Sequence, residues 1–305
     1  MTASHSDHRY SDPAALTRLT PDRTGPTILR MLLGAQLRRL REARGITLER
    51  AGYQIRASHS KMSRIELGRV SFKERDVADL LTLYGVTDSR ERETLCALAR
   101  RANEQGWWHN YSDILPQWFE FYVGLERAAD QIRTYQVQFV PGLLQTEDYA
   151  RAVVLLEHAD DPPDEITQRV KLRMTRQRLL TEPDAPGLWA VVDDAALRRP
   201  IGGPEVMHGQ LRHLIEVAAL PNVALQVIPF GAGGHAAAGG PFSILRFPET
   251  DLPDVVYLEQ LTSALYLGKR DDVDHYLAVM ERLCLEALPA GETPAILERI
   301  LKEFS

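Results

Sequence analysis

The chain has 305 residues, a formal net charge of −6 and only two cysteines, Cys96 and Cys284. This length is long for one compact unit and comfortable for two domains. Two distant cysteines exclude a disulfide framework, and both are expected to be buried free thiols. No segment resembles a signal peptide and no apolar stretch reaches the length of a membrane span, so we expect a cytoplasmic protein with no membrane partner.

The charge is unevenly distributed along the chain. Residues 1–105 carry 19 Lys and Arg against 13 Asp and Glu, whereas the remainder carries 17 against 29. Residues 28–75 alone carry 12 basic against 4 acidic residues, a local excess of +8. Such an excess is the electrostatic footprint of a surface that binds phosphates. We expect the N-terminal third to bind nucleic acid and the acidic remainder to face away from it.

The chain starts with a stretch that has no periodic apolar face. Residues 1–26 contain Pro13, Pro21 and Pro26 and are predicted to be a disordered arm. A first helix is expected from about Thr27 to Ala43, where apolar residues recur at helical spacing before Gly45.

The stretch 47–69 predicts two short helices joined by a tight turn. Thr47 and Ser58 are good N-caps, one for each helix, and Gly68 is a good C-terminal stop. The predicted inward positions are Leu48, Ala51, Ile55, Met62 and Ile65. The second helix presents a polar and basic face that suits the major groove, so the pattern is that of a helix-turn-helix. Helices at Phe72–Leu83 and from Thr87 to about Asn103 complete the unit.

Several residues of this segment fall at the spacings of a known family. Ser58, Ser60, the run Ser63-Arg64-Ile65-Glu66 and Gly68 match the lambda-repressor-like, or Xre-type, DNA-binding domain, which residues 27–83 resemble. The resemblance implies a five-helix reader of double-stranded DNA whose third helix enters the major groove. It also implies an ion pair between Arg41 and Glu66.

Docking the second helix of the motif in the major groove assigns roles to particular side chains. Its first residues and the residue one turn on would lie nearest the base edges, namely Ser58, His59, Ser60, Lys61 and Arg64. Residues at helix ends and flanks are expected to contact phosphates, namely Arg44, Thr47, Arg69 and Lys73. One recognition helix contacts few base pairs, so we expect a homodimer on an inverted repeat.

The composition changes after Gly106, where seven aromatic residues occur within about sixteen positions: Trp107, Trp108, Tyr111, Trp118, Phe119, Phe121 and Tyr122. So many large rings must pack against something, and a second domain is expected to begin here. The predicted domains are residues 1–26, 27–104 and 105–305. The segment 107–125 is expected to hold subunits or domains together, with burial inside one subunit as the alternative.

The rest of the chain alternates strand and helix patterns. Extended segments are predicted at 131–140, 187–193, 223–229, 241–247, 255–259 and 265–267, and helices at 146–156, 166–180, 204–219, 271–288 and 294–303. The fold class is therefore α+β, with an all-α N-terminal domain and a mixed α/β C-terminal domain. The helix 166–180 carries a row of basic residues that either pair within the protein, which we favour, or touch DNA.

Three separated segments resemble a second family. FYVGLERAADQIRTYQ, VPGLLQTEDYARAV and VVDDAALRRPIGGPEVMHGQLRHLIE are similar to the C-terminal domain of unknown function of actinobacterial, especially streptomycete, helix-turn-helix regulators. That family is described as antitoxin-like and is often encoded beside a small partner protein. The resemblance covers residues 107–305 and implies an interaction with such a partner.

No pattern in the sequence predicts catalysis, a metal or a cofactor. The glycine-rich segment 231–240 lacks the phosphate-loop pattern and lies between two strands, so a flexible hairpin is expected. His208 and His213 are five apart on a helix and do not share a face. We therefore expect a sequence-specific transcriptional regulator, not an enzyme. Its C-terminal domain would bind a small protein or dimerise; the alternative is a small-molecule receptor.

Overall fold

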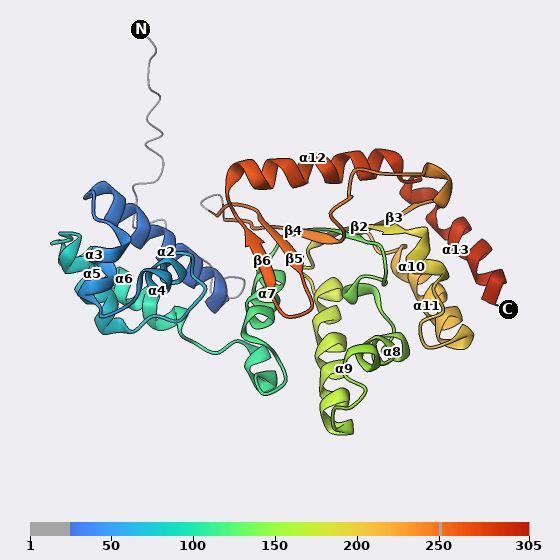
Figure 1. The fold of residues 1–305 in the computed structure, drawn as a ribbon, viewed down its shortest axis with the longest axis horizontal. Coiled ribbons are helices and arrows are strands. Elements are labelled where there is room, and N and C mark those ends of the chain that lie inside the picture. Colours follow the sequence, from blue (N-terminus) through green and yellow to red (C-terminus); the bar gives the residue numbers. More distant parts are fainter. Residues whose placement is uncertain (1–24, 250–251, 305) are drawn as a thin grey trace, which may run out of the picture. The chain divides into compact units, whose positions relative to one another are not determined.

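The computed structural model describes residues 25–249 and 252–304. Residues 1–24 of the predicted arm lie outside this range, and Pro26 is already the first residue of a helix. The chain forms two compact units, and the main division between them falls between His109 and Asn110 (Figure 1). None of the described helices is long and apolar enough to cross a membrane.

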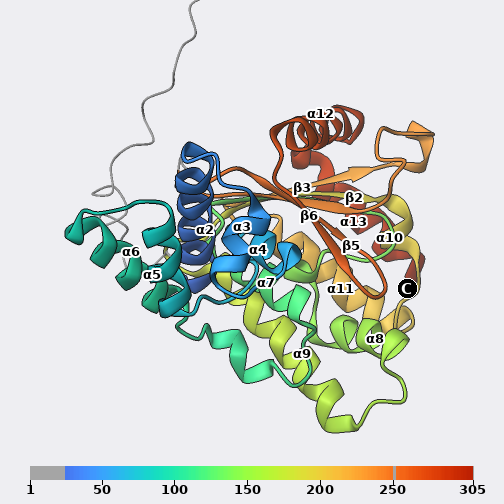
Figure 2. The same cartoon turned by 60° about the vertical axis from the view of Figure 1, so that its left-hand side comes forward.

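The N-terminal unit is a bundle of five helices around one apolar core (Figure 2). Its helices are α2 (Pro26–Ala43), α3 (Leu48–Gln54), α4 (His59–Glu66), α5 (Glu74–Leu83) and α6 (Ser89–Ala102). The fully buried side chains at the centre include Leu33, Leu37, Met62 and Leu95. All five predicted helices are present, each within two residues of its predicted start.

Two glycines allow α2 to pack directly on the end of α4. A Cβ atom on Gly34 would lie 2.6 Å from the carbonyl oxygen of Glu66, and one on Gly68 would lie 2.5 Å from the backbone nitrogen of Met31. Gly68 also has a φ of 67°, which L side chains rarely adopt. The predicted helix stop at Gly68 therefore serves a second purpose, because it lets two backbones approach.

The C-terminal unit is built on one six-stranded sheet with the order β3-β2-β1-β4-β5-β6. The strands are β1 (Gln131–Gln136), β2 (Gly187–Asp193), β3 (Val223–Ile228), β4 (Phe242–Arg246), β5 (Val255–Glu259) and β6 (Ala264–Leu267). β1, β2 and β3 pair in parallel, and the other pairs are antiparallel. Together with the helical N-terminal unit this sheet confirms the predicted α+β class.

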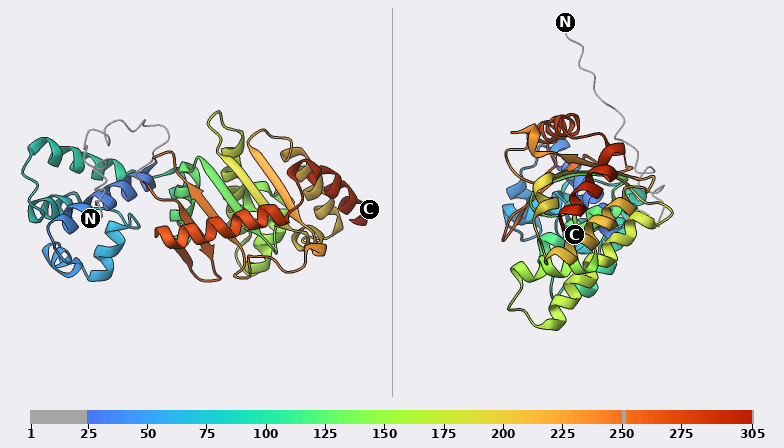
Figure 3. Two further views of the ribbon diagram at one scale, coloured as in Figure 1. Left: turned by 90° about the horizontal axis from the view of Figure 1, so that it is seen from above. Right: turned by 90° about the vertical axis from the view of Figure 1, so that its right-hand side faces the viewer.

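Helices cover both faces of the sheet. On one face lies α12 (Arg270–Glu286), which runs across β3, β4 and β5 (Figures 1 and 3). On the other face lie α7 (Gln117–Ala128), α8 (Glu147–Glu157), α9 (Pro163–Gln177), α11 (Pro204–Val217) and α13 (Thr293–Leu301). The short α10 (Asp194–Arg198) follows β2. Burial on both sides explains why β2 and β3 read as nearly continuous apolar runs.

The glycine-rich segment 231–240 is not a hairpin, contrary to our expectation. It connects β3 to β4, and the sheet order places β2 and β1 between those two strands. The segment is also held by its histidine, because His235 Nε2 lies 3.0 Å from the hydroxyl of the buried Tyr135. Strands that are consecutive in the sequence need not be neighbours in a sheet, and the periodicity of the sequence does not predict the order of the strands.

Candidate nucleic-acid interface

The two helices of the motif begin at side-chain caps. Thr47 Oγ1 accepts a hydrogen bond from the backbone N–H of Arg50 at 3.2 Å, and Ser58 Oγ accepts one from Lys61 at 3.2 Å. Each cap satisfies one of the N–H groups that have no partner in the first turn. Both predicted caps are therefore present, and they fix where α3 and α4 begin.

The turn between α3 and α4 is tight. A Cβ atom on Gly52 would lie 2.6 Å from the carbonyl oxygen of Ala57, so α3 needs a glycine there. Arg56 has a φ of 55°, the one positive φ of a non-glycine residue in the described part of the chain. This left-handed residue reverses the chain and sets the angle of α4 against α3.

The recognition helix α4 is amphipathic. Met62 and Ile65 are buried in the core, whereas Ser60 and Arg64, which are one turn apart, are both exposed. Lys61 is half-buried, and His59 is exposed with Nε2 3.5 Å from Glu49 Oε1 of α3. The Ser58 hydroxyl is engaged as the helix cap, and His59 lies beside Glu49. Of the five predicted base-reading residues, Ser60, Lys61 and Arg64 therefore have the side chains that are most free to reach bases.

The four predicted phosphate contacts lie at the ends of helices around α4. Arg44 is exposed after α2 and donates to the carbonyl oxygen of Gly85 at 3.2 Å. Thr47 is the cap of α3, and Lys73 is exposed at the N-cap position of α5. Arg69 is half-buried in the loop between α4 and α5. These four residues lie at or beside helix ends of the helix-turn-helix motif, and none of them belongs to its apolar core.

Two further residues of the motif are accessible and were not predicted. Tyr53 on α3 is 87% exposed, and Arg56 in the turn is exposed. Two features of the sequence could have indicated them. Tyr53 is a tyrosine at an outward position of a short helix, and Arg56 is a basic residue two positions before the N-cap Ser58. Both side chains lie on the segment that leads into α4, where they could add a stacking or phosphate contact.

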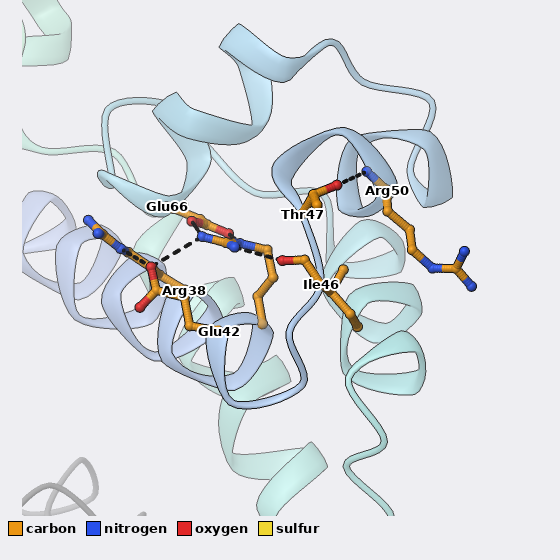
Figure 4. A network of polar contacts seen from close by, with 7 residues as sticks. Arg38, Glu42, Ile46, Thr47, Arg50 and Glu66 are labelled. Atoms are coloured by element: carbon orange, nitrogen blue, oxygen red, sulfur yellow. Dashed lines mark hydrogen bonds and ion pairs between the residues drawn. The ribbon is translucent and has the colours of Figure 1, made fainter.

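A buried ion pair holds α4 to α2. Arg41 donates from Nε to Glu66 Oε1 at 2.6 Å and from Nη2 to Glu66 Oε2 at 2.9 Å, and its Nη1 donates to the carbonyl oxygen of Ile46 (Figure 4). The two residues are 8% and 6% exposed. The hydrogen bond to Glu66 raises the pKa of Arg41 above its usual value. The structure thus brings together the two residues expected to pair.

Two aspartates at the end of β2 hold the first turn of the short helix α10. Asp193 Oδ1 accepts from the backbone N–H of Ala195 and caps α10, and Asp194 pairs with Arg198 at 2.9 Å. Cys96 and Cys284 are free but half-buried, less buried than expected, and burial raises the pKa of each thiol. Among the described residues, no group of three His, Cys, Asp or Glu could hold a metal ion.

The fold and this exposed helix define a DNA-binding helix-turn-helix protein, and comparison agrees because residues 32–95 match a helix-turn-helix domain family. Residues 119–299 match the domain of unknown function DUF5753, so the chain belongs to that family. No curated protein and no solved structure matches the chain.

Proposed function

We propose that this protein is a sequence-specific transcriptional regulator of the Xre type that acts in the cytoplasm and reads DNA through α4. The observation that carries the proposal is the exposed polar and basic face of a capped, well-packed second helix in a helix-turn-helix. The excess of basic residues at 28–75 supports it, because phosphate contacts supply most of the sequence-independent affinity. The target is double-stranded DNA.

Arg64 is proposed to read a base edge. Replacing Arg64 by alanine should weaken binding to the best operator by about 1–3 kcal/mol, roughly 5- to 150-fold, and change binding to random DNA much less. The measurement is equilibrium binding to both DNAs at fixed salt. Equal losses on operator and random DNA would make Arg64 a phosphate contact only.

Lys73 is proposed to contact a phosphate. The variant Lys73→Ala should weaken binding to all sequences alike and reduce the slope of log K against log salt by about 1. A titration of affinity against salt concentration measures that slope. Lys302, in the C-terminal unit, provides a control whose removal should leave the slope unchanged. A Lys73 variant with an unchanged slope would contradict the assignment.

We propose that the protein binds as a homodimer to an inverted repeat, since one recognition helix covers too few base pairs for genomic specificity. The aromatic segment 107–125 is a weaker candidate for the subunit contact than its sequence suggests. Tyr122 is buried within the C-terminal unit, where it contacts Tyr257 and, through its ring face, Arg176. Burial within one subunit thus accounts for Tyr122, whereas the rings of Trp118, Phe119 and Phe121 are half-buried.

For the C-terminal unit we propose an antitoxin-like role, the binding of a small protein encoded by an adjacent gene. The support is the resemblance to actinobacterial regulators. The alternative is a receptor for a small molecule. In either case a partner or ligand changes DNA affinity only by its differential affinity for two states of the protein, typically 1–3 kcal/mol.

The full chain should respond to the neighbouring small protein, whereas a truncation ending at Asn103 should bind DNA and not respond. The comparison is DNA affinity with and without the added small protein, beside genome-wide mapping of bound sites with and without the adjacent gene. If the full chain neither associates with that protein nor changes its DNA affinity, the partner hypothesis fails while DNA binding by α4 stands.

A further inference from the structure

The two edge strands of the sheet are not equally covered. At the β3 edge, the carbonyl oxygen of Leu225 accepts a hydrogen bond from the Thr293 hydroxyl at 2.6 Å, and that of Val227 accepts one from the backbone N–H of Leu288 at 2.9 Å. The segment 288–293 therefore covers the outer side of β3. At the other edge, β6 pairs with β5, and no other strand of the described residues pairs with it. An open strand edge is a template for pairing with another strand.

The hairpin of β5 and β6 extends beyond the rest of the sheet. β4 pairs with β5 only along Val255–Tyr257, whereas β6 pairs with it along Val256–Glu259. The hairpin is the orange pair of strands labelled β5 and β6 in Figure 1. Leu261 in its turn is 93% exposed, and Leu265 in β6 is 55% exposed. Two large apolar side chains are thus exposed at the open edge of the sheet.

The open edge is held in a fixed position by contacts on both faces of the hairpin. On one face, the hydroxyl of Tyr266 in β6 donates a hydrogen bond to the carbonyl oxygen of Trp118 in α7, and its ring contacts that of Phe121 with centroids 5.0 Å apart. On the other face, Leu267 packs against the apolar core between the sheet and α12. Because β6 is already ordered, pairing along its edge would require little further ordering of the chain.

The charges of the C-terminal unit favour a second copy as the strand that pairs with β6. Residues 106–305 carry 29 acidic against 17 basic residues, so two copies of this unit repel each other over most of their surfaces. Residues 260–268 contain no Asp, Glu, Lys or Arg, and they also lack proline. Charged residues and prolines are the features that prevent sheet edges from pairing. The hairpin is therefore a place where two acidic copies can approach.

The charges that flank β6 favour an antiparallel orientation of the two copies. Glu259 lies opposite Ala264 at the start of β6, and Lys269 follows the end of β6; both charged residues are exposed. When a strand pairs with its own copy about a two-fold axis, the start of each strand lies beside the end of the other. This pairing brings Glu259 of each copy toward Lys269 of the other, whereas a parallel pairing would bring like charges together.

We propose that the subunit contact of the homodimer is an antiparallel pairing of β6 with β6 of a second copy, with Leu261 and Leu265 adding apolar contacts. This inference rests on the proposed homodimer and locates its interface within the C-terminal unit. The same two-fold symmetry is the one that an inverted repeat requires. Because β6 has only four residues, the pairing should form a weak dimer in solution, which two half-sites on one DNA molecule strengthen.

The first test measures the dimer dissociation constant of the full chain by sedimentation equilibrium. Leu265→Asp places a charge at the proposed contact in both copies and should raise that constant about tenfold or more, because like charges across paired strands are destabilising. The matched control is Leu285→Asp on α12, which adds the same charge at a leucine that is 86% exposed and lies outside the hairpin, and which should leave the constant unchanged. Circular dichroism checks that both variants fold. A dimer that survives Leu265→Asp, or equal losses for the two variants, would overturn the β6 contact and leave the homodimer proposal intact.

The second test uses hydrogen exchange of the wild type and needs no substitution. Backbone amides of residues 264–267 should exchange more slowly at high protein concentration than at low, whereas those of β3, whose edge is covered within one subunit, should exchange equally at both. Exchange of 264–267 that is independent of concentration, in a protein that does dimerise, would place the contact elsewhere. A wild type that stays monomeric at its highest soluble concentration and binds one copy per operator would overturn both the homodimer and this contact.

Discussion

Replacing Glu126 by alanine is expected to lower the free energy of unfolding of the C-terminal unit by about 3–5 kcal/mol, the cost of leaving one charge of a buried pair uncompensated. Glu126 is 2% exposed and holds Arg176 through two hydrogen bonds that join α7 to α9. Without its carboxylate, the guanidinium of Arg176 retains only the ring faces of Phe119 and Tyr122. Chemical denaturation monitored by the fluorescence of Trp189 and other tryptophans would measure the loss.

The double variant Glu126→Leu with Arg176→Met should recover much of that stability, because replacing both partners removes both desolvation costs. If the double variant is as unstable as the single one, the loss arises from packing and not from the uncompensated charge. If the single variant is as stable as the wild type, the pair is not buried in solution.

The second large effect is expected in the DNA-binding unit, where Glu66→Ala should lower stability by about 3 kcal/mol or more. Glu66 accepts two hydrogen bonds from Arg41 and ties the end of α4 to α2, so its loss frees the recognition helix. The measurement is the melting temperature of the N-terminal transition, followed by circular dichroism at 222 nm, a wavelength that reports helix content.

Glu42 provides the control for this prediction. It forms the exposed pair with Arg38 at 2.8 Å and also lies 3.4 Å from Arg41 (Figure 4). Exposed pairs contribute about 0–1 kcal/mol, so Glu42→Ala should leave the transition nearly unchanged. Similar losses for Glu42→Ala and Glu66→Ala would contradict the view that burial of the pair decides its effect.

The helical unit could be predicted from the sequence because its determinants are local. Thr47 and Ser58 are caps whose partners lie three residues away, and Met62 and Ile65 are three positions apart on one face of α4. Gly68 stops α4 as expected. The sequence pattern could not predict that Gly34 and Gly68 bring the backbones of α2 and the end of α4 together, because this contact joins segments about thirty residues apart.

The sequence predicts where the strands of the sheet lie, but it does not predict their order in the sheet. The limits of β2 and β5 agree with the predicted segments because each is a short run of β-branched and aromatic residues between breakers. The crossover from β3 to β4 could not be predicted, because pairing of β4 with β1 depends on contacts more than a hundred residues apart. α7 was not predicted as a helix, since its rings obscure any helical period.

The sequence predicts which helix forms the candidate interface, but it predicts fewer of the contacts that its side chains make. The exposure of Ser60 and Arg64 follows from the helical period that buries Met62 and Ile65. The capping role of the Ser58 hydroxyl and the contact of His59 with Glu49 depend on side-chain geometry that the period does not contain.

The central claim is that α4 reads a specific DNA sequence, and selection of bound duplexes from a randomised library tests it most directly. The full chain should enrich one sequence with two inverted half-sites whose centres lie about 10 base pairs apart, as two recognition helices on one face of DNA require. Arg64→Ala should lose the preference at one position in each half-site. Recovery of random sequences by the wild type, at a salt concentration where it still binds DNA, would contradict the account.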